Sequence, residues 1–174
     1  MNSDQPTTMG FVTLAWVFVG AVTLHNFEEA IGLPSYWRHP PRIGGGRWLL
    51  GRPSDRALRF ALAILTILAV GVAVLATVGG AHSAGACLIA GYGLAMGLNA
   101  LFPHLLVTLV TRRYMPGTAT GVLLTLPASI RMIQCGVQES YLDLPGFLVW
   151  GPVIAFSLAA LIPLLFWVGG KIFR

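Results

Sequence analysis

The stretch LHNFEEA, residues 24–30, places three ionisable side chains near the end of a long apolar run. They are His25, Glu28 and Glu29. On an α-helix of about 100° per residue, Glu28 lies about 60° to one side of His25 and Glu29 about 40° to the other. The three side chains therefore share one arc of about 100°, from which a single helix can supply several ligands to a metal ion.

A second polar pair, Asn99 and His104, lies in the apolar stretch GLNALFPHLL. On an ideal helix these two residues would be about 140° apart. Pro103 removes a backbone hydrogen bond, and a π-bulge there would bring the i, i+5 pair toward one face. His25 and His104 also lie about 10 Å inside the same end of their apolar segments. The sequence therefore predicts that the two histidines share one site.

These side chains form a nitrogen and oxygen ligand set, which suits zinc, iron or manganese. We predict one divalent metal, foremost zinc, held by His25, Glu28, Glu29 and His104, with Asn99 as a further ligand or as an orienting group. With zinc, the chemistry would be hydrolysis, His25, Glu28 and Glu29 would be the catalytic residues, and the spare glutamate would act as the base. Two irons would favour oxidation of a lipid-like molecule, but only two histidines are well placed, which favours a single ion.

A third motif, RRYMPGTATG, follows the second at residues 112–121. Its proline and glycine predict a tight turn, and Thr118 is a suitable N-cap for the next helix. The structural interpretation is a turn flanked by basic membrane anchors. The alternative is that Arg112, Arg113 and Tyr114 bind an anionic substrate headgroup together with the free amides of the helix start.

The composition excludes a soluble globular domain. Of the 174 residues, 56% are hydrophobic and only 10% are charged, whereas a soluble domain usually carries about 25% charged residues. The net charge of +5 does not indicate binding of nucleic acid, because the basic residues flank apolar segments instead of lining one soluble face. We predict an all-α, polytopic transmembrane helix bundle whose partners are the lipid bilayer and a hydrophobic small-molecule substrate.

Five segments have the roughly 20 apolar residues that a helix needs to cross a bilayer. In a single membrane domain covering residues 1–174, the predicted spans are 9–31, 57–78, 84–111, 118–136 and 146–170. The first span is expected to end before Pro34. Residues 32–55, with Trp37 and Trp48 among arginines, are predicted to lie on the cytoplasmic headgroups. Pro127 leaves the fourth span open between a continuous and a re-entrant helix.

The distribution of basic residues predicts the orientation of the bundle. Ten of the 11 Lys and Arg residues fall on one side of it. By the positive-inside rule that side is cytoplasmic, which puts the N-terminus outside and the C-terminus inside. In the third span, Gly93 and Gly97 stand at GxxxG spacing, which favours close helix contact either within the chain or in a homodimer.

The three motifs, in this order, resemble the HXXEE family of small bacterial integral membrane proteins. The resemblance covers roughly residues 15 to 130 and rests on His25, Glu28, Glu29, Asn99, His104, Tyr114, Pro116, Gly117 and Thr120. It implies a multi-pass protein of the bacterial plasma membrane. Through the histidine and the glutamates it also implies a metal-binding enzyme, without naming a reaction.

Two other functions remain open. A buried glutamate of the first motif could protonate an alkene or epoxide while a histidine removes a proton, as in a metal-independent cyclase or isomerase of isoprenoid or other lipid-like substrates. Phe27, Phe102 and Trp16 would then shelter a carbocation. Intramembrane glutamate and histidine residues also serve proton relays, as in a small proton-coupled transporter or a membrane assembly subunit.

Overall fold

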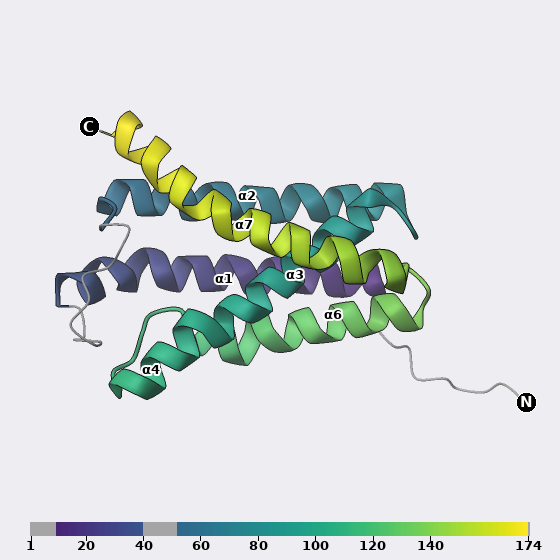
Figure 1. Cartoon of the computed structure of the whole chain (residues 1–174), viewed down its shortest axis with the longest axis horizontal. Helices are drawn as coiled ribbons and strands as arrows, with labels where there is room; N and C mark the ends of the chain where they lie inside the picture. The colour runs from purple at the N-terminus through teal and green to yellow at the C-terminus, as the bar shows by residue number, and fades with distance from the viewer. Residues whose placement is uncertain (1–9, 40–51, 174) are drawn as a thin grey trace, which may run out of the picture.

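The computed structural model describes residues 10–39 and 52–173, and these ranges are helical with no strand. Five helical stretches in them are long and apolar enough to cross a membrane, so the chain is an all-α, multi-pass membrane protein (Figure 1). The third span consists of three consecutive elements, and so does the fourth. In chain order the elements are α1 (Phe11–Arg38), α2 (Asp55–Gly79), α3 (Ala84–Asn99), η1 (Ala100–Leu105), α4 (Leu106–Thr111), α5 (Thr118–Thr120), η2 (Gly121–Thr125), α6 (Leu126–Gln138) and α7 (Leu144–Ile172).

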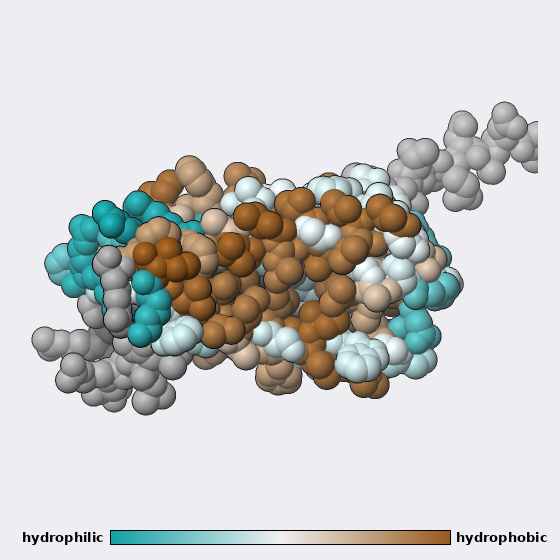
Figure 2. Space-filling model, turned by 90° about the horizontal axis from the view of Figure 1, so that it is seen from above, coloured by the Kyte–Doolittle hydropathy of each residue, from teal (hydrophilic) through white to brown (hydrophobic). Residues whose placement is uncertain are grey.

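On the face that Figure 2 shows, hydrophobic side chains form a belt across the middle of the bundle, and hydrophilic side chains gather at its two ends. One end carries the last turn of α7, the end of α1, the start of α2 and the turn after α4 (Figure 1). This end holds most basic residues of the described ranges, namely Arg38, Arg52, Arg56, Arg59, Arg112, Arg113 and Lys171. We call it the basic end. The opposite end carries the start of α1 and the turn between α6 and α7 (Figure 1).

Helix α1 continues to Arg38, past the predicted end of the first span at residue 31. Pro34 lacks the N–H that would bond to the carbonyl of Ala30, which is why a helix end was expected before it. In the structure, Nε of Arg59 in α2 donates to that carbonyl at 3.5 Å. The helix therefore passes through the proline because a neighbouring helix replaces the missing donor.

The prediction of a loop at residues 32–55 is wrong for residues 32–38, because these belong to α1. Trp37 lies in the last turn of this helix and packs against a small core that includes Leu33, Tyr36 and Met115. The other predicted interfacial tryptophan, Trp48, lies outside the described residues.

The third span changes its helical pitch at its polar pair. Helix α3 gives way to η1, which spans a kink, since Phe102 inside it leaves helical geometry at φ −135° and ψ 118°. The peptide bond between Phe102 and Pro103 is cis. The predicted kink at Pro103 is therefore confirmed, whereas the backbone between Asn99 and His104 is a break between two helices and not a regular π-bulge.

The fourth span is one continuous helix, not a re-entrant one, and it contains a π-helical stretch, η2. Gly121 begins η2 and allows it to come close to η1. A Cβ atom added to Gly121 would lie 3.3 Å from Cβ of Ala100 and 3.4 Å from Cε1 of His25. The two stretches η1 and η2 thus meet beside the histidine of the first motif.

The GxxxG spacing in α3 serves contact within the chain. A Cβ atom added to Gly93 would lie 2.6 Å from the Met132 side chain of α6, and one added to Gly97 would lie 3.7 Å from Ser129. The spacing left open whether these glycines serve contact within the chain or in a homodimer, and the structure shows the contact within the chain. Close packing of α3 on α6 holds the third and fourth spans together at the level of the polar residues.

Candidate metal centre

Three side chains from two spans converge in the bundle: His25 and Glu29 of α1, and His104 of η1. Nε2 of His104 lies 2.9 Å from Oε1 of Glu29, and Nε2 of His25 lies 3.7 Å from the same oxygen. One potential ligand atom from each residue lies within 4.8 Å of the other two. Both histidines are 1% exposed, whereas the Glu29 side chain is 12% exposed.

The donor set and its spacing fit a divalent metal ion. A tetrahedral zinc ion with bonds of about 2.0–2.1 Å places its ligand atoms about 3.3 Å apart. The two separations from Glu29, 2.9 and 3.7 Å, lie on either side of that value, and all three ligand atoms lie within 4.8 Å of one another, so that small side-chain shifts would bring them into that geometry. Two histidines and one carboxylate are also a ligand set that catalytic zinc uses when a water fills the fourth position.

Asn99 lies at the edge of this group. Its side-chain nitrogen is 3.2 Å from Nε2 of His25. Rotating the amide by a half-turn would present the oxygen instead, because the two ends of an amide have the same shape. Asn99 is therefore placed either to orient His25 or to add an oxygen ligand, the two roles that the sequence predicted for it.

The rotation of α1 about its axis is fixed by the neighbour of His25. Asn26 is buried and points the other way, where its amide donates to the hydroxyl of Thr66 at 2.8 Å and to the carbonyl of Leu62 at 3.3 Å. Both acceptors belong to α2. Anchoring Asn26 on α2 turns His25 and Glu29 toward the third and fourth spans.

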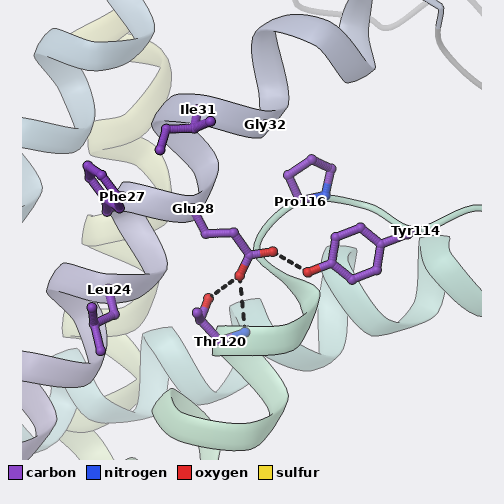
Figure 3. Close-up of a pocket in the computed structure, with 8 residues that line it drawn as sticks. All are labelled: Leu24, Phe27, Glu28, Ile31, Gly32, Tyr114, Pro116 and Thr120. Carbon is purple, nitrogen blue, oxygen red and sulfur yellow. Dashed lines mark hydrogen bonds between the residues drawn. The ribbon is translucent and has the colours of Figure 1, made fainter.

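Glu28 does not join the three converging side chains. Its Oε1 accepts hydrogen bonds from the Tyr114 hydroxyl and from the Gly117 amide, the latter at 2.8 Å. Its Oε2 accepts from the Thr120 amide at 3.1 Å and from the Thr120 hydroxyl at 2.6 Å (Figure 3). Glu28 was predicted to be a metal ligand and a base, but in the structure both of its oxygens accept hydrogen bonds from residues around the start of the fourth span.

Thr118 was predicted to cap the fourth span, and that prediction is wrong. Gly117 is the N-cap residue, at φ 95°, and the carboxylate of Glu28 accepts from its amide and from the Thr120 amide, which an N-cap side chain would otherwise satisfy. The Thr118 hydroxyl donates to the Met115 carbonyl at 2.6 Å and lies 3.2 Å from the His104 carbonyl. It therefore ties the turn to the backbone of η1.

Gly117 also provides the space that the two histidine rings occupy. A Cβ atom there would lie 2.5 Å from Cε1 of His104 and 3.0 Å from Cε1 of His25. The two rings meet edge to face, with centroids 4.9 Å apart. Nδ1 of His104 is buried and has no hydrogen-bond partner among the described residues, so this ring is held by Nε2 and by packing.

Two of the three predicted headgroup ligands make contacts inside the protein. Arg113 donates to the His39 carbonyl and lies over the ring of Tyr36, 5.5 Å from its centroid. Tyr114 donates to Glu28 and accepts from the Ala119 amide at 3.1 Å. Burial, and then the bond to the Glu28 carboxylate, raise the pKa of the Tyr114 phenol above its ordinary value.

Arg112, the third predicted headgroup ligand, ends α4 at the basic end. It is exposed and adopts the left-handed conformation at φ 51°. Unlike Arg113, it makes no side-chain hydrogen bond or ion pair with another described residue. The predicted headgroup role therefore rests on Arg112 alone among the three residues.

A shallow apolar groove of about 440 Å³ runs along α1 beside Glu28 (Figure 3). Its walls are Leu24, Phe27, Glu28, Ile31, Gly32, Tyr114, Pro116 and Thr120. Phe27 and Ile31 are 63% and 61% exposed, so the groove opens on the hydrophobic belt. Thr120 belongs both to this groove and to the surroundings of His25, since its hydroxyl lies 3.3 Å from Nδ1 of that histidine.

Sequence reasoning missed Gly117 and Thr120 as parts of the site. Both stand in the third motif and contributed to the resemblance, but neither carries an ionisable group, so they were not included among the candidate ligands. Gly117 and Thr120 could have been identified from two features of the sequence, the glutamates in the first span and the helix start in the third motif. A carboxylate within an apolar helix needs donors, and a helix start supplies free amides.

Comparison with known proteins identifies the family of the chain. A family model described as "Protein of unknown function with HXXEE motif" matches residues 16–132, a range that includes every side chain of the candidate site. The chain belongs to the HXXEE family. It is similar to the uncharacterized protein YrkK of Bacillus subtilis (strain 168), with 32% identity over 156 residues that cover 89% of this chain and 94% of the relative. No solved structure matches the chain.

In the structure, the two glutamates of the HXXEE motif face different parts of the bundle. Its histidine and its second glutamate, Glu29, face His104 across the bundle. Its first glutamate, Glu28, faces the turn between the third and fourth spans. One helical turn of α1 therefore organises both the converging donors and the loop that packs against them.

Proposed function

We propose that this HXXEE protein is a membrane-embedded, metal-dependent enzyme in which His25, Glu29 and His104 hold one divalent ion, foremost zinc. The observation that carries the proposal is the convergence of these three donors from two spans, with both histidines 1% exposed. Buried ionisable groups inside a membrane bundle are costly unless they are paired or ligate a metal. Iron or manganese would suit the same donor set.

The chemistry that such an ion supplies is Lewis acidity or an activated water at its open position, which favours hydrolysis. The protein's own residues supply the rest. The Asn99 amide, next to His25, orients the ligand or contacts a bound polar group. Glu28 is not proposed as a ligand or as a base, because its two oxygens already accept four hydrogen bonds.

A lipid-like or otherwise hydrophobic substrate fits the surroundings of the site. The apolar groove beside Glu28 opens on the hydrophobic belt and shares Thr120 with the wall around His25. The turn that docks on Glu28 lies at the basic end, with Arg112 exposed beside it. With that end in the cytoplasm of a bacterial plasma membrane, the substrate would enter from the cytoplasmic leaflet and its anionic head would meet Arg112.

A second candidate function is metal-independent acid–base catalysis. The contact that favours it is the 2.9 Å pair between Nε2 of His104 and Oε1 of Glu29, a geometry suited to proton transfer. The aromatic side chains do not support the carbocation version of this chemistry. Trp16, Phe27 and Phe102 are 40%, 63% and 67% exposed on the outer surface. Activity that persists in a strong chelator would favour this second function.

The metal content of the purified protein tests the leading proposal. Protein purified in mild detergent and loaded with Zn²⁺ should retain about one ion per chain after dialysis, as measured by plasma emission spectrometry. The His25→Ala variant should retain none. His39→Ala is the matched control, because His39 is an exposed histidine at the end of the same helix, and it should retain the ion. Absence of bound Zn²⁺, Fe²⁺ and Mn²⁺ from the folded wild-type protein would refute the metal site.

A further inference from the structure

Glu28, Thr120 and His25 form a chain of hydrogen bonds that leads away from the converging donors. Glu28 Oε2 lies 2.6 Å from the Thr120 hydroxyl, and that hydroxyl lies 3.3 Å from Nδ1 of His25. The other nitrogen of the ring, Nε2, faces Glu29 and Asn99. The direction of the hydrogens along this chain decides which ring nitrogen of His25 carries a lone pair.

The first link has only one direction. Each carboxylate oxygen of Glu28 accepts from a backbone amide, Gly117 on Oε1 and Thr120 on Oε2, and amides are donors only. Oε2 then also accepts the single hydrogen of the Thr120 hydroxyl. With that hydrogen committed to Glu28, the hydroxyl can offer His25 only a lone pair.

The second link follows from the first. A lone pair on the Thr120 oxygen requires a hydrogen on Nδ1 of His25, 3.3 Å away. A neutral imidazole carries one hydrogen, so Nε2 of His25 has the free lone pair. Nε2 is the atom that lies 3.7 Å from Oε1 of Glu29, on the side where His104 also points.

We propose that Glu28 and Thr120 are positioning residues that fix the Nδ1–H tautomer of His25 and so present Nε2 as the metal-binding atom. This inference rests on the metal site proposed above. Metal-ligating histidines commonly donate their second nitrogen to a carboxylate, which orients the ring and strengthens the ligand. Here a threonine hydroxyl stands between the carboxylate and the imidazole.

The same carboxylate joins this chain to the fold. Glu28 also accepts from Tyr114 and Gly117, so the turn between the third and fourth spans docks on the side chain that sets the His25 tautomer. Thr120 is in place only when that turn is docked. The first glutamate of the motif thereby makes the metal-binding form of His25 depend on correct packing of the fourth span against α1.

Thr120→Val tests the relay, because valine keeps the shape of threonine and removes the hydroxyl. The full-length protein in detergent should bind Co²⁺ about 10- to 100-fold more weakly in this variant, measured by titrating the visible absorption of the bound ion. Thr120→Ser keeps a hydroxyl and should restore binding close to the wild-type value. Thr125→Val is the matched control, since Thr125 is 0% exposed in the same span and its hydroxyl faces the Ala21 carbonyl at 3.5 Å, away from the relay.

Two outcomes of this titration would overturn the proposal. One is wild-type affinity in Thr120→Val, and the other is an equal loss in Thr120→Ser or Thr125→Val, since either shows that the hydroxyl at residue 120 is not what matters. The tautomer is read separately from ¹⁵N chemical shifts of the histidine side chains in metal-free protein, with His25 assigned from the His25→Ala variant. Nδ1–H in the wild type and its loss in Thr120→Val support the relay, whereas Nε2–H in the wild type refutes it.

The two readouts separate failure of the relay from failure of the metal site. If the wild-type protein binds no Co²⁺ but His25 shows the Nδ1–H tautomer that Thr120→Val abolishes, the relay stands and the metal proposal fails. If Co²⁺ binds equally well to the wild type and to Thr120→Val, the metal site stands and the relay fails.

Discussion

The two adjacent glutamates of the HXXEE motif have different surroundings, although they are neighbours in the sequence. Glu29 shares its Oε1 between two histidine nitrogens at 2.9 and 3.7 Å. Glu28 accepts four hydrogen bonds, from Tyr114 and Gly117 in the turn between the third and fourth spans and from Thr120 at the start of the fourth span. In the function proposed above, Glu29 is a metal ligand, whereas Glu28 is a structural acceptor of hydrogen bonds.

This difference predicts opposite effects of the same conservative change. Glu29→Gln should abolish retention of Zn²⁺ while changing the free energy of unfolding little, since the amide oxygen of glutamine can still accept a hydrogen bond from Nε2 of His104. Glu28→Gln should lower the free energy of unfolding by about 1–3 kcal/mol, because an amide group then faces donors that a carboxylate accepted. Unfolding in SDS, followed by circular dichroism, and metal analysis measure the two effects. Equal metal loss without destabilisation in Glu28→Gln would contradict the assignment.

The helical phase of LHNFEEA predicted that His25, Glu28 and Glu29 face one direction, but not which glutamate meets the histidine of the third span. That distinction depends on donors at Tyr114, Gly117 and Thr120, which lie 86 to 92 residues further along the chain. A sequence alone gives no contact between such distant segments. The pairing of His25 with His104 was predictable because proline-induced pitch change and similar depth are local features of each span.

Among the helical elements, η1 and η2 are the ones that bring polar residues together. They cross at small side chains, since a Cβ atom on Gly121 would lie 3.3 Å from Cβ of Ala100 and 3.4 Å from the His25 ring. The sequence predicted the kink in η1 because Pro103 disturbs the third span. It did not predict η2, because Pro127 left open only whether the fourth span is continuous or re-entrant, and η2 ends at Thr125, two residues before that proline.

Gly121→Val should therefore push the fourth span away from the third at the metal site. Overpacking of this kind costs about 1–3 kcal/mol of stability, and here it should also weaken Co²⁺ binding because the added methyl groups meet the His25 ring. Gly20→Val is the matched control in α1, since a Cβ atom on Gly20 meets nothing within 4 Å. Thermal unfolding in detergent and the Co²⁺ titration should both leave Gly20→Val near the wild type. Unchanged Co²⁺ affinity in a folded Gly121→Val protein would show that this crossing does not shape the site.

The two ends of the bundle differ in charge, because most basic residues of the described ranges lie at one of them. Five spans put the turn between α2 and α3 and the end of α7 on opposite sides of a bilayer. The spans, their order and the clustering of basic residues were predictable because hydrophobicity and charge are properties of sequence. The exact end of α1 was not, because it depends on a hydrogen bond from Arg59 in another helix.

If the basic end faces the cytoplasm, cysteines placed at the two ends should react with a membrane-impermeant maleimide from opposite sides. Ala81→Cys, in the exposed turn after α2, should be labelled in spheroplasts, whereas Lys171→Cys, in the last turn of α7, should be labelled only in inverted membrane vesicles. Both changes are made in a variant with alanine at residues 87 and 135, so that no native cysteine reacts. The reversed labelling pattern would place the site toward the outer leaflet and remove the argument for a cytoplasmic substrate. Labelling of both cysteines from one side would contradict the odd number of spans itself, because three spans separate residues 81 and 171.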